Sequence, residues 1–355
     1  MKTRPSPPPA PPRRAFVTGA TGLLGSNLVR ALVARGIGVR ALARSRAKAE
    51  KQLSELTGVE IIEGDMTNVG SFAKALAQVD VVFHTAAHFR AAYQGGDHRE
   101  RLHRVNVSGT RDLLHAAWDA GVRRFVHTSS IAVLNGPPGA LIDETMRRTP
   151  DEADDYYRSK IQSEHEVEKF LARHADMWAC FVLPGWMHGP GDSGPTSAGQ
   201  TVLDFVQRKL PGVPPGTFSI VDARDVAAAL IAAAEHGRRG ERYLAAGRHC
   251  DMAGLFAELE RASGVPSPRR RIPLFALRLL GLMEESVARI ARRPALLSLA
   301  TVRLMAQEND RSRFDHQKSF RELGLSFRPL ADTLRDEIAW YRAQGWLPAT
   351  AEKSG

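Results

Sequence analysis

The sequence predicts an α/β fold, with a doubly wound parallel sheet and a smaller, mainly helical C-terminal domain interleaved with it. Three observations predict this fold. Short apolar runs rich in Val, Ile and Phe alternate with amphipathic segments of helical length. A glycine-rich turn follows the first apolar run and opens the first helical segment. After residue 184 this alternation changes to loops rich in Gly and Pro, and it returns only once.

The strand candidates are apolar over their whole length, as expected for parallel strands that helices cover on both faces. In chain order they are Ala15–Thr18, Val39–Leu42, Val59–Ile62, Val79–Phe83, Arg124–His127 and Met177–Leu183. In the first helical segment, Leu24, Leu28 and Leu32 are spaced by four and form one apolar face. The later return predicts a strand at Thr217–Val221, a helix at Asp222–Glu235 and a strand at Arg242–Leu244.

Composition excludes several classes of protein. The longest apolar run, Val226–Ala234, is about half as long as a bilayer-spanning helix. The segment Met1–Arg14 is rich in proline where a secretory signal would be apolar. Two cysteines, Cys180 and Cys250, are too few for a disulfide scaffold and fit a reducing cytosol. The net charge of +10 is spread over scattered arginine pairs without interleaved aromatic residues, so we do not expect nucleic-acid binding.

The glycine-rich turn is Gly19-Ala-Thr-Gly22-Leu-Leu-Gly25. Between a strand and a helix, such a turn brings backbone amides and a helix N-terminus against a pyrophosphate. Gly22 permits close approach of the phosphates, and Gly25 permits close packing of the helix on the strand. This context predicts a dinucleotide site of the Rossmann type. The cofactor contacts expected here are Gly19, Thr21, Gly22, Leu23, Leu24 and Gly25.

Arg44 follows the second strand, where an acidic residue would bind the adenosine ribose of NAD. A guanidinium suits the 2′-phosphate of NADP instead, and Arg46 or Lys48 would assist it. The sequence therefore favours NADP(H), with NAD(H) as the alternative, while a solvated basic loop is the plainer interpretation. After the third strand, Asp65 beside Met66 is expected to bind the adenine amino group, although a turn aspartate is nearly as good an interpretation.

Tyr156 and Lys160 are four residues apart at the start of a predicted helix, with about 5–6 Å between their Cβ atoms. An ammonium so close stabilises a phenolate, and lowering a tyrosine pKa by about three units requires about 4 kcal/mol. The fifth strand ends in Thr128-Ser129-Ser130, at the sheet edge where ligands bind in open α/β folds. We predict that Ser130, or alternatively Ser129, binds a substrate carbonyl while Tyr156 exchanges its proton.

Seven motifs occur in order along the chain: Thr18-Gly-Ala-Thr-Gly-Leu-Leu-Gly25, Gly64-Asp65, His84-Thr-Ala-Ala87, Asn106-Val-Ser-Gly-Thr110, Thr128-Ser-Ser130, Tyr156-xxx-Lys160 and Leu183-Pro-Gly-Trp-Met-His-Gly-Pro-Gly191. Together they resemble the extended short-chain dehydrogenase/reductase superfamily and its NAD-dependent epimerase/dehydratase family. The resemblance covers nearly everything from Arg14 to Leu347. It is strongest to the branch of dihydroflavonol reductases, 3β-hydroxysteroid dehydrogenases and hopanoid-associated sugar epimerases.

The resemblance implies contacts to the nicotinamide half of the cofactor from Thr85, Ala86, Ala87, Asn106, Thr128, Tyr156, Lys160, Pro184 and Met187. In this reading, Ala86 and Ala87 line the nicotinamide ribose and Thr128 lies under the ring. Arg44 matches the arginine of the NADP-using dihydroflavonol reductases, whereas sugar-nucleotide epimerases usually carry an acid there.

The implied reaction is hydride transfer between nicotinamide and a secondary alcohol or ketone of an apolar, polycyclic or aromatic small molecule. A sugar epimerase or dehydratase is one alternative. A non-catalytic NADP-sensing regulator is another, although a sensor would not need the serine, tyrosine and lysine. No metal is expected, because no Cys or carboxylate completes a site with His84 and His88. The loop residues expected near the substrate, for which ordinary packing is the plainer interpretation, are His88, Phe89, Tyr93, Trp186 and His188.

These assignments divide the chain into segments. We expect residues 1–13 to form a flexible Pro-rich leader and residues 14–184 to form the NAD(P)-binding domain, to which 217–246 return. Residues 185–216 and 247–347 form the substrate-binding domain, and 348–355 form a tail. We expect a cytoplasmic homodimer.

One segment is unusually basic, because residues 261–300 hold eight arginines and two glutamates. If residues 273–293 are helical, an apolar face is expected from Ala276, Leu280, Met283, Val287 and Ile290. The opposite face would carry Arg278, Glu285, Arg289 and Arg292. Two interpretations stay open. The apolar face packs on the protein's own core, or residues 269–293 lie peripherally on an anionic membrane surface.

Overall fold

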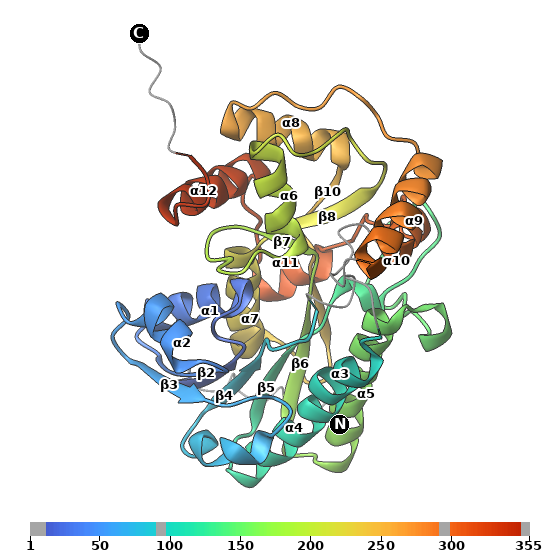
Figure 1. Cartoon of the computed structure of the whole chain (residues 1–355). Helices are drawn as coiled ribbons and strands as arrows, with labels where there is room; N and C mark the ends of the chain where they lie inside the picture. Colours follow the sequence, from blue (N-terminus) through green and yellow to red (C-terminus); the bar gives the residue numbers. More distant parts are fainter. Residues whose placement is uncertain (1–11, 90–96, 291–298, 349–355) are drawn as a thin grey trace.

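The computed structural model describes residues 12–89, 97–290 and 299–348. Its main sheet has seven strands in the order β3-β2-β1-β4-β5-β6-β9, and each pair of neighbours is parallel (Figure 1). The strands are β1 Arg14–Thr18, β2 Gly38–Ala43, β3 Val59–Glu63, β4 Val81–His84, β5 Arg124–Thr128, β6 Trp178–Pro184 and β9 Arg242–Ala245. The predicted doubly wound parallel sheet is confirmed.

Helices cover both faces of this sheet because neighbouring strand residues point to opposite sides. Val17 and Phe83 belong to a core shared with α1 (Leu23–Val33) and α7 (Ala223–His236). Phe16 and Val82, one position earlier in each strand, belong to the core on the other face. That second core is completed by α4 (Gly109–Asp119) and α5 (Asp155–Arg173).

A second, three-stranded sheet follows the order β10-β8-β7, with β7 at Trp186–His188, β8 at Thr217–Asp222 and β10 at Arg248–Asp251. It packs with α6 (Ser197–Val206), α8 (Met252–Ser263) and α12 (Leu330–Ala343) in a separate core. In Figure 1 this layer lies above the carboxyl ends of the main strands. The parts of the chain are therefore arranged as the predicted interleaved domains require.

One strand differs from the expectation. Residues 217–246 were expected to return to the first domain as a unit, but β8 pairs with β7 and β10, and only α7 and β9 belong with the main sheet. Just after β6, a Cβ on Gly185 would be 2.3 Å from the Ala246 carbonyl oxygen and 2.5 Å from that of Ser219. Glycine at this position lets the chain pass close to both segments, and the residues that follow it form β7, which pairs with β8.

The remaining helices are α2 Arg46–Leu53, α3 Arg99–Leu102, α9 Leu274–Ile290, α10 Leu299–Gln307 and α11 Gln317–Leu323. A π-helical turn spans His103–Ser108, and 3₁₀ turns lie at Val69–Ser71, Ala73–Leu76, Ile131–Val133 and Pro150–Glu152.

The helix predicted in the basic segment is present as α9. Leu277 and Gly281 are buried, whereas Leu280 and Met283 of the predicted apolar face are exposed. The interpretation in which that face packs on the protein's own core is therefore wrong for these two residues. The helix carries apolar residues around most of its circumference, so periodicity alone does not determine which side is buried. The predicted Glu285, Val287, Arg289, Ile290 and Arg292 lie outside the described side chains.

Candidate active site

Polar side chains meet where parallel strands end side by side. Thr18 lies opposite His84 in the sheet, and His84 lies opposite His127. The ring nitrogens of His84 contact Thr18 Oγ1 at 2.8 Å and Thr110 Oγ1 at 2.9 Å. Burial, aided by the charge of Lys160, lowers the pKa of His84 to about 3. The neutral ring therefore ties β1 and β4 to α4 directly beneath the glycine-rich turn.

The glycine-rich turn meets the steric and electrostatic needs of a pyrophosphate. Gly19 has a φ of +67°, and a Cβ there would lie 2.9 Å from the Ala86 Cα atom. A Cβ on Gly25 would lie 2.1 Å from the Gly19 carbonyl oxygen, so only glycine lets α1 pack this closely. Gly22 precedes α1, and no side chain caps the helix N-terminus. An uncapped helix N-terminus with close backbone access fits a bound phosphate.

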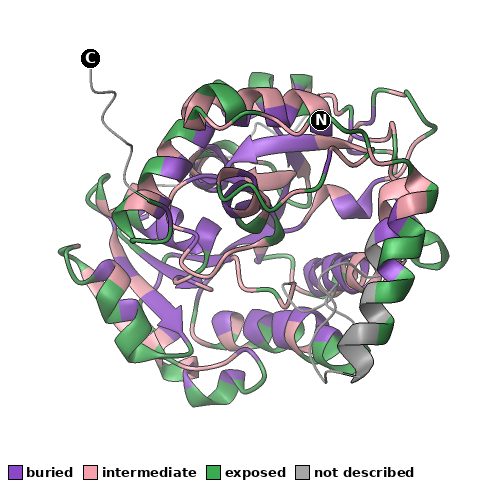
Figure 2. Ribbon diagram, turned by 45° about the horizontal axis from the view of Figure 1, so that its top comes forward, coloured by how far each residue is buried: buried purple, intermediate pink, exposed green. Residues whose placement is uncertain are grey.

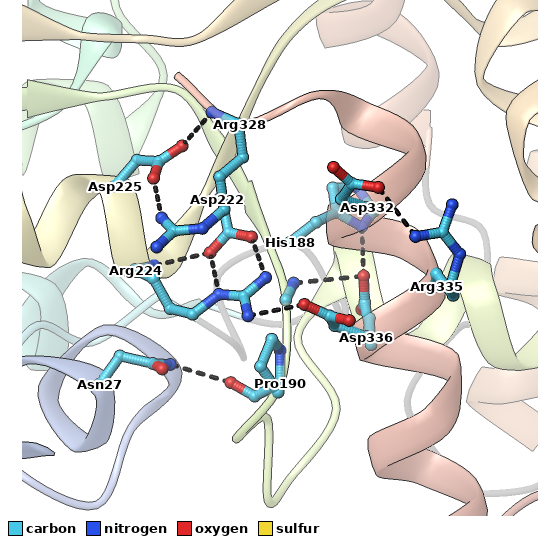
Figure 3. A network of polar contacts seen from close by, with 12 residues as sticks. Asn27, His188, Pro190, Asp222, Arg224, Asp225, Arg328, Asp332, Arg335 and Asp336 are labelled. Atoms are coloured by element: carbon cyan, nitrogen blue, oxygen red, sulfur yellow. Dashed lines mark hydrogen bonds and ion pairs between the residues drawn. The ribbon is translucent and has the colours of Figure 1, made fainter. Parts of the chain in front are cut away.

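A loop from the second layer covers this turn. Asn27 of α1 donates from Nδ2 to the Pro190 carbonyl oxygen at 2.8 Å, and Ser193 Oγ donates to the Thr21 carbonyl oxygen at 3.4 Å. Figure 3 shows Asn27 directed at Pro190, with residues of α12 on the other side of the loop. We call residues 189–193 the covering loop.

The covering loop is held from behind by α12. Glu337 Oε2 accepts hydrogen bonds from His188 Nδ1 at 3.0 Å and from the Gly189 amide at 3.2 Å, and both side chains are buried. Nearby, Arg224 bridges Asp222 at 2.6 Å and Asp336 at 2.7 Å (Figure 3). These contacts link the start of α7 and the covering loop to the same helix.

The candidate acid lies in the first turn of α5. Asp154 caps this helix by accepting the Tyr157 amide at 2.7 Å, which sets Tyr156 one turn before Lys160. Burial raises the pKa of Tyr156 above 10, and the Asp154 charge adds to this, while a hydrogen bond with the Ser130 side chain lowers it. The net effect is a raised pKa, which disfavours the phenolate form expected from the nearby Lys160. Tyr156 in the protein alone holds its proton at neutral pH.

Lys160 reaches the end of β5. Its Nζ donates to the Thr128 carbonyl oxygen at 2.7 Å, and the side chain is buried. Burial lowers the pKa of Lys160 to about 8, and the Glu164 charge counteracts part of this shift. Lys160 is therefore mostly charged at neutral pH, in a place where few groups screen it.

The two serines that compete for the catalytic role are in different surroundings. Ser130 is extended, so its side chain and that of Ser129 point to opposite sides of the chain. Ser130 Oγ shares a hydrogen bond with Tyr156 and accepts the Ala132 amide at 3.1 Å. Ser129 Oγ is buried and has no hydrogen-bond partner among the described residues. The geometry favours Ser130.

A π-helical turn, which no sequence pattern indicated, positions Asn106. Its Nδ2 donates to Ser159 Oγ at 2.9 Å and to the His88 carbonyl oxygen at 3.2 Å, and its Oδ1 accepts the His88 amide at 2.7 Å. Asn106 thus ties the segment after β4 to α5. Such turns are frequent at functional sites. The motif indicated the residue, but a single π-helical turn leaves no periodicity that would reveal its partners.

Of the residues expected at the substrate, Phe89 lies against the candidate acid. The rings of Phe89 and Tyr156 are 4.8 Å apart, edge to face. His88 is half-buried, and its Nε2 has no partner in the part of the chain that the structure describes. Tyr93 lies outside the described residues.

Trp186 and His188, also expected at the substrate, belong to the second layer. Trp186 packs on Phe218 with ring centroids 4.7 Å apart and donates from Nε1 to Ser197 Oγ at 3.2 Å. The buried His188 ring is bound to Glu337. Both therefore have packing partners of their own, as the plainer interpretation proposed.

At the adenosine end, Arg44 is exposed directly after β2. Asp65 Oδ1 accepts hydrogen bonds from both the amide and the hydroxyl of Thr67 at 2.8 Å. One of the two carboxylate oxygens of Asp65 therefore stabilises the turn. Burial raises the pKa of Asp65, but the Thr67 hydrogen bonds and the charges of Arg44 and Arg101 lower it overall. Two arginines thus create a positive field at this edge.

The other predicted cofactor residues occupy strand ends and helix starts. Thr85 Oγ1 donates to the Thr18 carbonyl oxygen at 2.6 Å, and the neighbouring Ala87 is exposed. Leu23 and Leu24 are buried in the first turn of α1, and Met66 is buried after β3. Pro184 ends β6, and the half-buried Met187 lies in β7.

Within the described ranges, no helix is long and apolar enough to span a bilayer. No three His, Cys, Asp or Glu side chains among those residues are grouped as a metal site would need. The homodimer and the cytoplasmic location remain predictions.

The chain matches the NAD dependent epimerase/dehydratase family over residues 15–246. It is 38% identical over 337 residues to sterol demethylase protein B of Methylococcus capsulatus, covering 94% of this chain and 99% of that protein. It is 32% identical to a putative dihydroflavonol 4-reductase of Synechocystis, covering 94% and 95% of the two chains. The crystal structure of gox2253 superposes with a TM-score of 0.79 at 32% identity, covering 94% and 99%. The chain therefore belongs to the NAD-dependent epimerase/dehydratase family of the extended short-chain dehydrogenase/reductases and is an NAD(P)-dependent oxidoreductase.

Proposed function

We propose that the protein reduces a ketone of an apolar, polycyclic or aromatic small molecule to a secondary alcohol, with NADPH preferred over NADH. The observation that carries this proposal is the hydrogen bond between Ser130 and a half-buried Tyr156 that holds its proton, one helical turn from Lys160. A phenol that holds its proton is ready to donate it to a carbonyl oxygen that receives a hydride at its carbon.

A nicotinamide cofactor held in this site would supply the hydride. Ser130 binds the carbonyl oxygen, and Tyr156 donates the proton as negative charge develops there. Lys160, held by the Thr128 carbonyl oxygen, stabilises the phenolate that remains. The glycine-rich turn, the uncapped start of α1 and the covering loop bind and enclose the pyrophosphate.

Three observations support an apolar substrate and NADPH. Phe89 presents an aromatic edge to Tyr156, which favours a flat apolar molecule beside the acid. The names of the two relatives refer to sterols and to dihydroflavonols. Arg44 stands where NAD-binding members carry an acid, and Arg101 adds to the positive field there.

A sugar epimerase remains the second candidate because the family includes that chemistry. The two functions differ in cofactor balance, since an epimerase returns the hydride to the carbon that lost it. The test supplies NADPH deuterated at C4 with a panel of steroid and flavonoid ketones and, in a parallel assay, NAD⁺ with a panel of nucleoside-diphosphate sugars. We expect a deuterated alcohol and an equal amount of NADP⁺. Epimerised substrate without net cofactor oxidation would support the epimerase, and cofactor binding without turnover of either substrate class would support a sensor.

Titration with NADPH and with NADH tests the cofactor preference. Arg44→Ala should raise the dissociation constant of NADPH about ten- to a hundredfold, as expected for a lost charge-assisted contact, and should leave NADH binding unchanged. Arg35→Ala, which removes an exposed arginine just after α1, is the matched control. Equal effects of Arg44→Ala on both cofactors would remove the phosphate-binding role.

A further inference from the structure

Helix α9 turns a continuous apolar surface to solvent. Four exposed apolar residues of this helix are spaced by four, three and one positions along the chain. This spacing places their side chains on one face of the helix. We call them the α9 stripe: Phe275, Leu279, Leu282 and Met283, with exposed fractions of 74%, 59%, 51% and 58%. Leu277 and Gly281, on the other side of the helix, are buried. Figure 2 shows the exposed turns of this helix along the edge of the molecule.

This surface is unusual for the molecule. Of the eight large hydrophobic side chains that are most exposed among the described residues, five lie in α9, counting Leu280. The other three, Leu141, Phe320 and Trp346, are separated along the chain. Single exposed apolar residues are common on soluble proteins, whereas a contiguous patch on one helix indicates a contact surface.

Fixed positive charge adjoins the stripe. Arg269, Arg270 and Arg271 are exposed immediately before α9. Their backbone is anchored by Val213, which donates from its amide to the Arg270 carbonyl oxygen at 2.8 Å and accepts the Ile272 amide at 2.9 Å. The arginines are therefore held at a defined place beside the first turn of the helix.

Two of these arginines line a cleft of about 400 Å³ together with Arg208. Its apolar lining comprises Phe205, Leu210, Pro211, Pro266 and Pro268. Guanidiniums over an apolar floor match an anionic headgroup attached to an acyl chain. Hydrogen bonds from Ser267 and the charge of Arg269 lower the pKa of Glu260 in α8. The Glu260 carboxylate accepts the Ser267 amide at 3.1 Å.

We propose that the α9 stripe and this arginine cleft form a docking surface for a bilayer of anionic phospholipids. The stripe enters the acyl boundary, and Arg208, Arg269 and Arg270 bind headgroup phosphates. A second copy of the chain is a poorer occupant, because a symmetric contact would set arginines against arginines. The chain's net charge of +10 favours an anionic surface in the same way.

The surface is connected to the wall of the candidate active site. Helix α9 packs on α10, and the chain just after α10 carries Glu308, which pairs with the buried Arg148 at 2.9 Å. The Arg148 guanidinium lies 4.9 Å from the centre of the Tyr157 ring, next to Tyr156. Helix α9 is therefore connected to the catalytic helix α5 through α10, Glu308 and Arg148.

The test is cosedimentation of the full chain with vesicles of phosphatidylglycerol and phosphatidylcholine, and with vesicles of phosphatidylcholine alone. We expect binding to the anionic vesicles that weakens as salt is raised. Replacing Arg269, Arg270 and Arg271 with Ala should lower the partition coefficient on the order of a hundredfold. A matched triple replacement of the exposed Arg35, Lys51 and Arg173 with Ala should have little effect.

The apolar half is tested with Phe275→Ser, which should also reduce binding, against Phe320→Ser, which removes an exposed phenylalanine of α11. All replaced side chains are exposed, and thermal melting verifies that each variant is folded. No binding at low salt, or equal losses in the two triple variants, would overturn the proposal. A wild-type dimer that Phe275→Ser converts to a monomer would assign the stripe to a protein interface instead. Because the readout is sedimentation, failure of the proposed reductase activity would not affect this result.

Discussion

At the scale of single residues, burial acts on the two candidate catalytic groups in opposite directions. It raises the pKa of Tyr156, which keeps the phenol protonated, and it lowers the pKa of Lys160 to about 8, which leaves the ammonium mostly charged at neutral pH. The pair therefore suits donation of a proton, followed by stabilisation of the resulting phenolate. The sequence indicated Tyr156 and Lys160 as candidates, but it did not predict which of them holds its proton, because the sign of a pKa shift depends on burial.

The two serines of this strand end provide the residue-scale prediction. Ser130→Ala should lower kcat about a hundred- to a thousandfold, because it removes a donor to the developing oxyanion. Ser129→Ala removes a buried hydroxyl without a described partner, so kcat should stay near that of the wild type and stability should not fall. Steady-state kinetics and cofactor titration of both variants decide between them. If Ser129→Ala is the crippling change, the assignment at this strand is wrong.

At the scale of elements, the last helix supports the loop that covers the start of the first helix. Helix α12 holds the covering loop through Glu337, and the loop closes over the N-terminus of α1 through Asn27 and Ser193. These elements are separated by most of the chain, so no local sequence pattern indicated the contact. The sequence left substrate contact and ordinary packing open for His188, and its ring is buried beside α12, where it contacts Glu337.

This arrangement predicts that Glu337 is a positioning residue for cofactor binding. Glu337→Ala should weaken cofactor binding about tenfold, the effect of about one lost hydrogen bond to a charged group, while kcat at saturating cofactor stays near normal. Glu337→Gln keeps an acceptor for the Gly189 amide and should rescue part of the affinity. Asp332→Ala, on the exposed side of the same helix, is the control. Lower stability with unchanged cofactor affinity would reduce Glu337 to a structural role.

At the scale of the whole molecule, local patterns were sufficient for the sheet and insufficient for its partners. The six apolar runs became β1 to β6 with small changes at their ends, because a doubly covered parallel strand must be apolar throughout. The sheet to which β8 belongs depends on pairing with β7 and β10, which its own residues do not encode. The inward face of α9 and the π-helical turn around Asn106 likewise depend on packing and hydrogen bonds between distant segments.

The most direct test of the proposed function is the variant Tyr156→Phe. Phenylalanine keeps the ring packing against Phe89 and removes only the hydroxyl that donates the proton. Turnover of a ketone substrate should fall at least about a thousandfold, within the range for loss of a general acid, while the dissociation constant of NADPH, measured by titration, stays that of the wild type. Near-normal turnover in this variant would contradict the account.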